Sequence, residues 1–446
     1  MQIRHQRRTG RMLALVLGAL CAAADALAQT STDFCGCAGS PNSLGSLVSR
    51  TESSWPPGTV QRNDFFGGCE DAIEVPLPPD GVVVFDSIDL NGTTLRGCSA
   101  NLTFSRNAAN TPVTLLVKGD VTIRSGARIS VNGFNGGNGT NGGAGTPGSG
   151  GLGGFAGGEG AYQLVNFANI GGNGVGPGGG LGSVVNPFAF AGGGIFVGVP
   201  ELRPLLGGSG GGGGRSDDGT TGASGGGGGG GGGAILIAAN GTIDIQSGGR
   251  ILADGGLGGS RGSNAATAGA GGSGGAIRLL ANRIQGSGNI FARGASPGNC
   301  CDGLSANGGT NGRIRMEAIF NTFAADNSTP IAVRAPAPGP LANPITPTVR
   351  ITGIDGAATP TNPIGFQNSV DMIVDAPGVI QVDLATTDVP AGTDVAVTVK
   401  PKVGAAPTTQ NVTLASCTSG ACTAATSFDL AAGAYIVEAR ATFQTP

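Results

Sequence analysis

Residues 234–256 read AILIAANGTIDIQSGGRILADGG, and this phrase decides the fold. It contains three short strands of alternating apolar residues, separated by polar or glycine turns. Related phrases occupy 114–133, 276–294 and 313–335, and each has the same three strands in the same order. A three-strand phrase that recurs in one order predicts an all-β fold, a parallel β-solenoid (β-helix), rather than a sandwich or an antiparallel sheet.

The alternation within these strands indicates which side chains face the core. A period of two places every other side chain on one face, so like positions in successive phrases should stack into aliphatic columns. Each buried aliphatic side chain contributes roughly 1.5–3 kcal/mol. The expected inward residues are Leu115, Val117, Ile129, Val131, Ile235, Ile237, Ile251, Ala253, Ile277, Leu279, Ile290, Ala292, Ile314, Met316, Ile331 and Val333. The expected solvent-facing residues are Arg128, Arg250, Arg278, Arg315 and Glu317.

Glycine accounts for 88 of the 446 residues and is concentrated in loops that follow the third strand of each phrase. Such loops should lie on one face of the stack. Two arrangements stay open: flexible loops, because glycine loses the most entropy on ordering, or extended segments packed like polyproline II, as at the axis of collagen. The apolar stretches 161–170 and 183–206 lie inside the long insertion at 134–233 and would need burial, which favours an ordered layer.

The first 28 residues have the pattern of a signal peptide. Four arginines precede an apolar run over 12–24, and Ala26-Leu27-Ala28 is a small-x-small cleavage site. The run is shorter than the roughly 20 residues that a bilayer span requires. We therefore expect export, with a mature chain that begins at Gln29 and has no integral membrane span. The expected location is extracellular or the bacterial cell surface, with the periplasm as an alternative.

The remaining chain divides by composition into four segments. Residues 29–80 are expected to be an irregular, cysteine-containing segment, and 81–335 the glycine-rich β-solenoid. A proline-rich linker follows at 336–344. Residues 345–446 contain strands at regular spacing with proline and glycine turns, which is typical of an immunoglobulin-like β-sandwich.

Nine cysteines are present, and eight remain after signal removal. An even number in an exported chain predicts disulfides. Cys417 and Cys422 flank a short turn and are expected to close a hairpin. No C-x₂-C pair or neighbouring histidine supports a metal site, so neither a metal nor a cofactor is expected. The connectivity stays open for Cys35, Cys37, Cys69, Cys98, Cys300 and Cys301.

The sequence offers little catalytic chemistry. Its one histidine, His5, lies in the signal peptide, so the mature chain lacks Ser-His-Asp and Cys-His nucleophile activation. Asp217-Asp218 is the one adjacent acidic pair of the solenoid region, and we interpret it as a solvated loop tip. Charged residues make up 12% of the chain, with a net charge of −3, so no basic patch for nucleic acid is expected. No catalytic residue is predicted.

Glycine spacers precede AILI and AIRL, and G-x-I-x-A closes both phrases. In these features residues 82–335 resemble glycine-rich parallel β-helix surface proteins of bacteria, among them adhesin and autotransporter passengers and the glycine repeats of mycobacterial PGRS proteins. The resemblance implies a secreted or surface-attached, non-catalytic structural or adhesive protein. Its partners would be surface polysaccharide or other surface or matrix proteins. The alternatives are a polysaccharide-active β-helix lyase or hydrolase and a carbohydrate- or ice-binding module.

Overall fold

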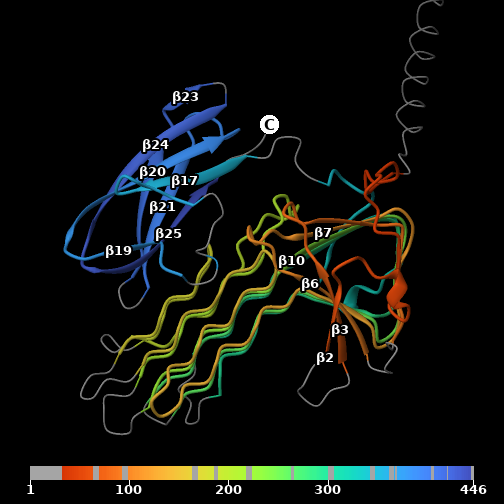
Figure 1. Ribbon diagram of the computed structural model, residues 1–446, viewed down its shortest axis with the longest axis horizontal. Coiled ribbons are helices and arrows are strands. Elements are labelled where there is room, and N and C mark those ends of the chain that lie inside the picture. Colours follow the sequence, from red (N-terminus) through yellow and green to blue (C-terminus); the bar gives the residue numbers. More distant parts are fainter. Residues whose placement is uncertain are drawn as a thin grey trace, which may run out of the picture.

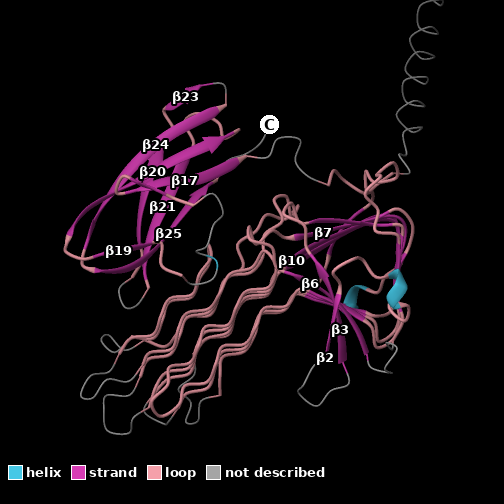
Figure 2. Cartoon of the chain, in the orientation of Figure 1, coloured by secondary structure: helices cyan, strands magenta, loops and turns pink. Residues whose placement is uncertain are grey.

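The computed structural model is all-β over the residues it describes, where helix is confined to short 3₁₀ turns (Figure 2). Two of these turns are η1 (Glu52–Ser54) and η2 (Ala325–Asn327). Within the described ranges no helix is long and apolar enough to cross a membrane. The structure describes residues 33–63, 70–92, 99–162, 169–184, 189–216, 223–262, 266–299, 306–341, 347–360, 366, 369–402, 406–418 and 420–442.

Two long sheets share one apolar core, and we call them together the parallel-sheet region (residues 46–335; Figure 1). All strand pairs in both sheets are parallel except β2 with β3. The first sheet contains β1 (Ser46–Val48), β4 (Val82–Phe85), β5 (Ser87–Leu90), β7 (Val113–Val117), β8 (Val121–Ile123), β10 (Ala234–Ile245), β12 (Ala276–Gly286), β14 (Arg313–Asn321) and β16 (Val333–Ala335). The second contains β2 (Val60–Asn63), β3 (Glu70–Pro76), β6 (Ser99–Ser105), β9 (Arg128–Ser130), β11 (Arg250–Leu252), β13 (Asn289–Phe291) and β15 (Ser328–Thr329).

The strand register stacks like positions of the repeated phrases, as the sequence predicts. Ile277 pairs with Ile235 on one side and with Ile314 on the other, and Ile251 pairs with Ile290 in the second sheet. These side chains are completely buried in the shared core. Every expected inward residue from Leu115 to Met316 is buried.

The prediction fails for Ile331 and Val333, which are 72% and 45% exposed. The third strand of the last phrase is β15, where Ser328 pairs with Ile290. Val333 instead begins β16 and pairs with Arg315 in the first sheet. The proline after Thr329 shortens the strand, so the alternation expected at 331–333 falls in the wrong sheet.

The prediction that Arg278 and Glu317 face solvent is wrong. They lie on the outer side of the first sheet, yet their exposed fractions are 1% and 2%. Arg278 pairs with Glu317 at 2.9 Å, and Arg315 also donates to that carboxylate at 2.7 Å. The linker covers the pair, because the guanidinium donates to the carbonyls of Pro340 and Leu341. Both side chains point away from the core, but a segment later in the chain covers them.

Burial alone would raise the pKa of the Glu317 carboxyl. Hydrogen bonds from Arg278 and Arg315, and from the backbone N–H of Gly339, outweigh this effect and hold the pKa of Glu317 below its usual value. The carboxylate therefore stays ionised in a nearly dry site, fully surrounded by donors. This cluster fastens residues 339–341 across the sheet.

The stretch 29–80 is less irregular than the sequence predicts. Residues 46–48 form β1 and pair with β5, and residues 70–76 form β3 and pair along their full length with β6. The prolines of this stretch fall at strand ends and turns, where a missing N–H costs little.

Residues 347–442 form two antiparallel sheets around a separate apolar core, and we call them the C-terminal unit. Alternate side chains of the long strands fill this core, among them Val382, Leu384, Val395 and Val397. One sheet contains β18 (Ala357–Ala358), β17 (Thr348–Ile354), β20 (Gly378–Thr387), β24 (Ala421–Leu430) and β23 (Ser416–Thr418). The other contains β19 (Met372–Val374), β25 (Gly433–Ala441), β21 (Asp394–Pro401) and β22 (Thr408–Thr413).

Candidate functional site

The glycine-rich segments form an ordered, hydrogen-bonded array beside the parallel sheets, where Figure 1 shows them as extended, nearly parallel traces. Their backbone hydrogen bonds recur every third residue between the same two segments. Three residues per turn is the period of the polyproline-II helix, which has no hydrogen bonds of its own and so can bond to neighbours. For example, bonds of 2.8 Å run from Gly133 to Asp254, from Gly136 to Leu257 and from Gly139 to Ser260.

The uninterrupted glycine run 225–233 lies at the centre of this array. Its N–H groups point in three directions, toward segments 131–137, 155–161 and 267–273. A Cβ atom on successive residues would meet the backbone of three further segments, so six neighbours surround the run. On Gly229, for instance, a Cβ would overlap the carbonyl oxygen of Gly256. The three further segments are 146–149, 208–211 and 256–259.

This geometry explains the composition of the run. A polyproline-II helix with neighbours on all sides has no direction left for a side chain, so each of its residues must be glycine. A helix at the surface keeps one free direction, and every third residue there can carry a side chain. Exposure follows this rule over 293–299, where residues 293, 296 and 299 are exposed and those between them are not.

The segments stack in layers, which we name from the side away from the C-terminal unit. The outer layer continues β9, β11 and β13, and the middle layer leads into β10, β12 and β14. The glycine layers therefore extend the two sheets sideways. The outer layer comprises 132–139, 253–260 and 292–299; the middle layer 145–151, 225–233, 267–275 and 306–312; the third layer 154–161, 191–195 and 207–214; and the fourth layer 171–183.

The C-terminal unit packs against the third and fourth layers. Lys400 donates to the carbonyl of Gly176 at 2.7 Å and pairs with Glu438 at 2.8 Å. Asn173 donates to the carbonyl of Pro401 at 2.9 Å. Ile436 is buried against Ala156 and Val175. The unit thus covers one side of the array, and the outer layer lies on the other side.

Asparagine side chains complete the outer layer. The Oδ1 atoms of Asn132, Asn135 and Asn138 accept hydrogen bonds of 2.7–2.8 Å from backbone N–H groups of the next segment. This ladder was not predicted from the sequence. Its signal was the Asn-Gly spacing of three residues over 132–139, which matches the polyproline-II period.

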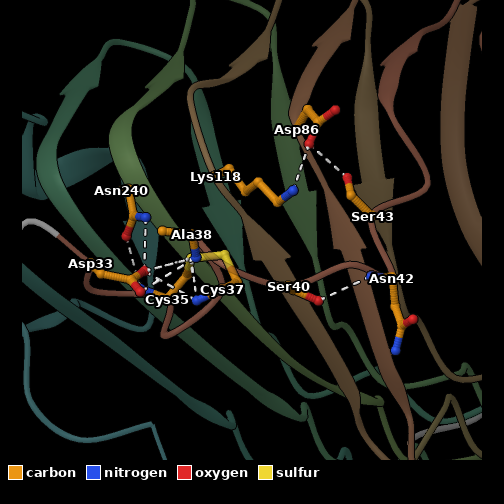
Figure 3. The surroundings of a disulfide bond; sticks show 10 residues. All are labelled: Asp33, Cys35, Cys37, Ala38, Ser40, Asn42, Ser43, Asp86, Lys118 and Asn240. Carbon is orange, nitrogen blue, oxygen red and sulfur yellow. Dashed lines mark hydrogen bonds and ion pairs between the residues drawn. A yellow bond between two sulfur atoms is a disulfide. The ribbon is translucent and has the colours of Figure 1, made fainter.

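Cys35 and Cys37 form a buried disulfide on the outer side of the first sheet (Figure 3). The Asp33 carboxylate receives hydrogen bonds from Asn240 of β10 and from the backbone N–H groups of Cys37 and Ala38. The bond from Asn240, followed by those from the backbone, holds the pKa of Asp33 below its usual value despite some desolvation. The loop is thereby fixed to β10.

Asp33, Cys35 and Cys37 are also the one group of potential metal ligands that lie close together in the described part of the chain. Metal binding by cysteine requires thiolates. Both sulfur atoms are instead engaged in the disulfide, so this form of the site holds the loop and offers no sulfur ligand. The chemistry of the cluster is structural.

The predicted disulfide between Cys417 and Cys422 is confirmed, and it joins paired positions of β23 and β24. The pairing of Cys35 with Cys37 settles one of the connectivities that the sequence left open. The remaining cysteines, Cys69, Cys98, Cys300 and Cys301, lie outside the described residues, as do Asp217 and Asp218.

A cavity of about 300 Å³ opens in the C-terminal unit between β18 and β19, and Asp355 and Asp371 contribute to its lining. Burial raises the pKa of Asp371, and the Glu438 charge adds to this, although the N–H of Val437 donates to the carboxylate and lowers it. The hydrogen bond from the backbone N–H of Val437 ties Asp371 to β25.

Comparison with protein-family models, with curated proteins and with solved structures gives no match for this chain.

Proposed function

We propose that this chain is an exported, non-catalytic structural or adhesive protein. Its body would be a parallel β-solenoid, and residues 345–446 an immunoglobulin-like sandwich. The observation that carries the proposal is the layered glycine array, in which the run 225–233 is hydrogen-bonded on all sides. Such an array provides a broad, stiff surface, which suits attachment or assembly.

Two features support the architecture. Ile235, Ile277 and Ile314 lie in register in one sheet, and the chain crosses to the second sheet between them, as successive turns of a solenoid do. The C-terminal unit has two antiparallel sheets around a common core, as in immunoglobulin-like domains.

Export is supported by the signal-peptide pattern at 1–28 and by the two disulfides. Disulfides persist in oxidising compartments and are rare in the cytosol. Surface polysaccharide and other surface or matrix proteins are the partners that fit a broad array with few charged side chains.

Cell fractionation of the native host tests the location. We expect the mature protein, beginning at Gln29, outside the cytoplasm, on the surface or in the medium. Recovery in the cytosol with residues 1–28 still attached would contradict export.

Turnover assays on pectins, alginates and glucans test the absence of catalysis. We expect no product from the purified protein, and the same result from an Asp217→Asn, Asp218→Asn variant. Product formation that disappears in this variant would replace the structural proposal with a polysaccharide-active enzyme.

A further inference from the structure

The outer layer presents a regular surface on the side away from the C-terminal unit. Each of its three segments turns every third residue outward, and neighbouring backbone fills the other two directions except at the edge of the layer, where Phe134 is also exposed. We call these nine positions the polar face. They are Asn132, Asn135, Asn138, Asp254, Leu257, Ser260, Arg293, Ser296 and Asn299.

Hydrogen bonds between neighbouring segments align these positions in rungs. Asn132 accepts from the N–H of Asp254 at 2.7 Å, and Asp254 in turn accepts from the N–H of Arg293 at 2.7 Å. The second rung continues from Asn135 to Leu257, and the third from Asn138 to Ser260. The lateral order of the side chains is therefore fixed by the backbone.

The spacing along the segments is equally regular. Three residues of polyproline II rise about 9 Å, which is the distance between successive rungs. Glycine underlies the face: at Gly133 and Gly136 a Cβ would overlap the middle layer. Gly255, Gly256, Gly258 and Gly259 of the central segment have no side chain, whereas Phe134 at the edge of the layer is 64% exposed, so the face is flat except along this edge.

The chemistry of the face is neutral and rich in hydrogen-bonding groups. Its two charged side chains, Asp254 and Arg293, pair with each other at 2.6 Å. The side chains of Asn132, Asn135 and Asn138 turn Oδ1 toward the next segment, which leaves the donor end of each amide for another partner. Leu257, in the central rung, is 48% exposed and adds an apolar contact.

We infer that the polar face binds a neutral, linear polysaccharide, an inference that rests on the proposed adhesive function and names its ligand. Sugar hydroxyls both donate and accept hydrogen bonds, as the amide and hydroxyl groups of the face do, while the C–H side of a sugar ring packs on Leu257. A polymer with a constant repeat engages several rungs together, so weak contacts add up to useful avidity. A polyanion or polycation finds no net charge to match.

Binding of the mature, full-length protein to cellulose, chitin and soluble neutral β-glucan tests the inference, with alginate and pectate as anionic comparisons. The test variant is Leu257→Arg with Ser296→Arg, which places two long side chains above the flat face at exposed positions. The control is Val379→Arg, at a residue of the C-terminal unit that is 69% exposed. Thermal unfolding of both variants checks that they remain folded.

We expect the wild-type protein and the control to bind at least one neutral polymer, and the double variant to bind it about tenfold more weakly or worse, a change of at least ~1.4 kcal/mol. The inference is overturned if no neutral polymer binds, if only the anionic polymers bind, or if the double variant binds as the wild type does. None of these results bears on export or on the absence of turnover, so failure of this inference can be distinguished from failure of the proposed function.

Discussion

The strands of the parallel-sheet core and the segments of the glycine layers alternate along the chain, yet side chains have opposite roles in the two regions. In the sheets, stacked aliphatic residues such as Ile237 and Ile277 fill the core. In the layers, the run 225–233 packs because it has no side chains, and hydrogen bonds between backbones hold it. Each such bond contributes about 0.5–1.5 kcal/mol net.

The difference shows what each region tolerates. A conservative change in the sheet core, such as isoleucine to valine, costs about 0.5–1.5 kcal/mol because the neighbours partly relax. A single added methyl in the centre of the layers meets carbonyl oxygens that are themselves fixed by hydrogen bonds. The layers tolerate side chains at the outward positions, which is where a binding surface can vary without loss of the array.

The largest expected effect separates core from surface in the sheets. Ile237→Asp places an unpaired carboxylate in a fully buried column and should cost several kcal/mol, enough to unfold the parallel-sheet region. Ile331→Asp makes the same change at a residue that is 72% exposed. Its melting temperature should stay close to that of the wild type, and equal losses in the two variants would contradict the assignment of the core.

The next effect concerns the buried ion cluster under the linker. Arg278→Ala leaves the Glu317 carboxylate buried without its main partner, which should cost about 3–5 kcal/mol in the free energy of unfolding. The double variant Arg278→Met, Glu317→Leu removes both charges and should recover most of that stability. Denaturant unfolding measures the stability of both variants. An unchanged free energy of unfolding for Arg278→Ala would contradict the burial of this ion pair.

A smaller but diagnostic effect distinguishes packed glycine from incidental glycine. Gly229→Ala overpacks the centre of the layers and should cost about 1–3 kcal/mol or more. Gly39→Ala adds the same methyl where nothing lies within 4 Å, and its backbone is not in the left-handed region. Thermal unfolding should separate the two variants, and equal stability would mean that the array has room for side chains.

The smallest effect is a difference in acid sensitivity. Because the pKa of Glu317 is lowered in the folded protein, its contribution is present above the unfolded pKa of about 4.3 and is lost as the pH falls through the folded value. Glu317→Gln should therefore flatten the loss of stability below about pH 4.3. Asp371 has a raised pKa, so it adds stability as the pH falls from its folded value toward its unfolded value of about 3.9, and Asp371→Asn should remove that gain and steepen the loss over this range. Unfolding free energies measured from pH 7 downward give both slopes, and slopes that change with the same sign would contradict the two assignments.

Much of the sheet architecture could be predicted from sequence, because alternation and repetition are local signals. Ile235, Ile277 and Ile314 each begin a similar phrase, and their alignment in the sequence is their alignment in space. The prediction failed where a distant segment decided the outcome. Nothing near Arg278 indicates that residues 339–341 cover it, so its burial could not be read from the strand alone.

The glycine array was predictable only in part. Glycine content left flexible and packed loops both open, and only the apolar stretches in the insertion favoured an ordered layer. The neighbours of Gly229 come from segments far away in the sequence, and no side-chain pattern records them. In the outer layer, side chains occur at every third residue, and the asparagines at 132, 135 and 138 show this three-residue period in the sequence. The pairing of Cys35 with Cys37 stayed open because any even set of cysteines allows many connectivities.

Amide hydrogen exchange over the run 225–233 tests most directly the claim that the glycine layers are an ordered, fully hydrogen-bonded array. Exchange in the mature, full-length protein can be compared with that of β10, which follows the run without a break. Since every N–H of the run is bonded to a neighbouring segment, we predict protection close to that of β10. Exchange at the rate of an unstructured chain, with β10 still protected, would contradict the account.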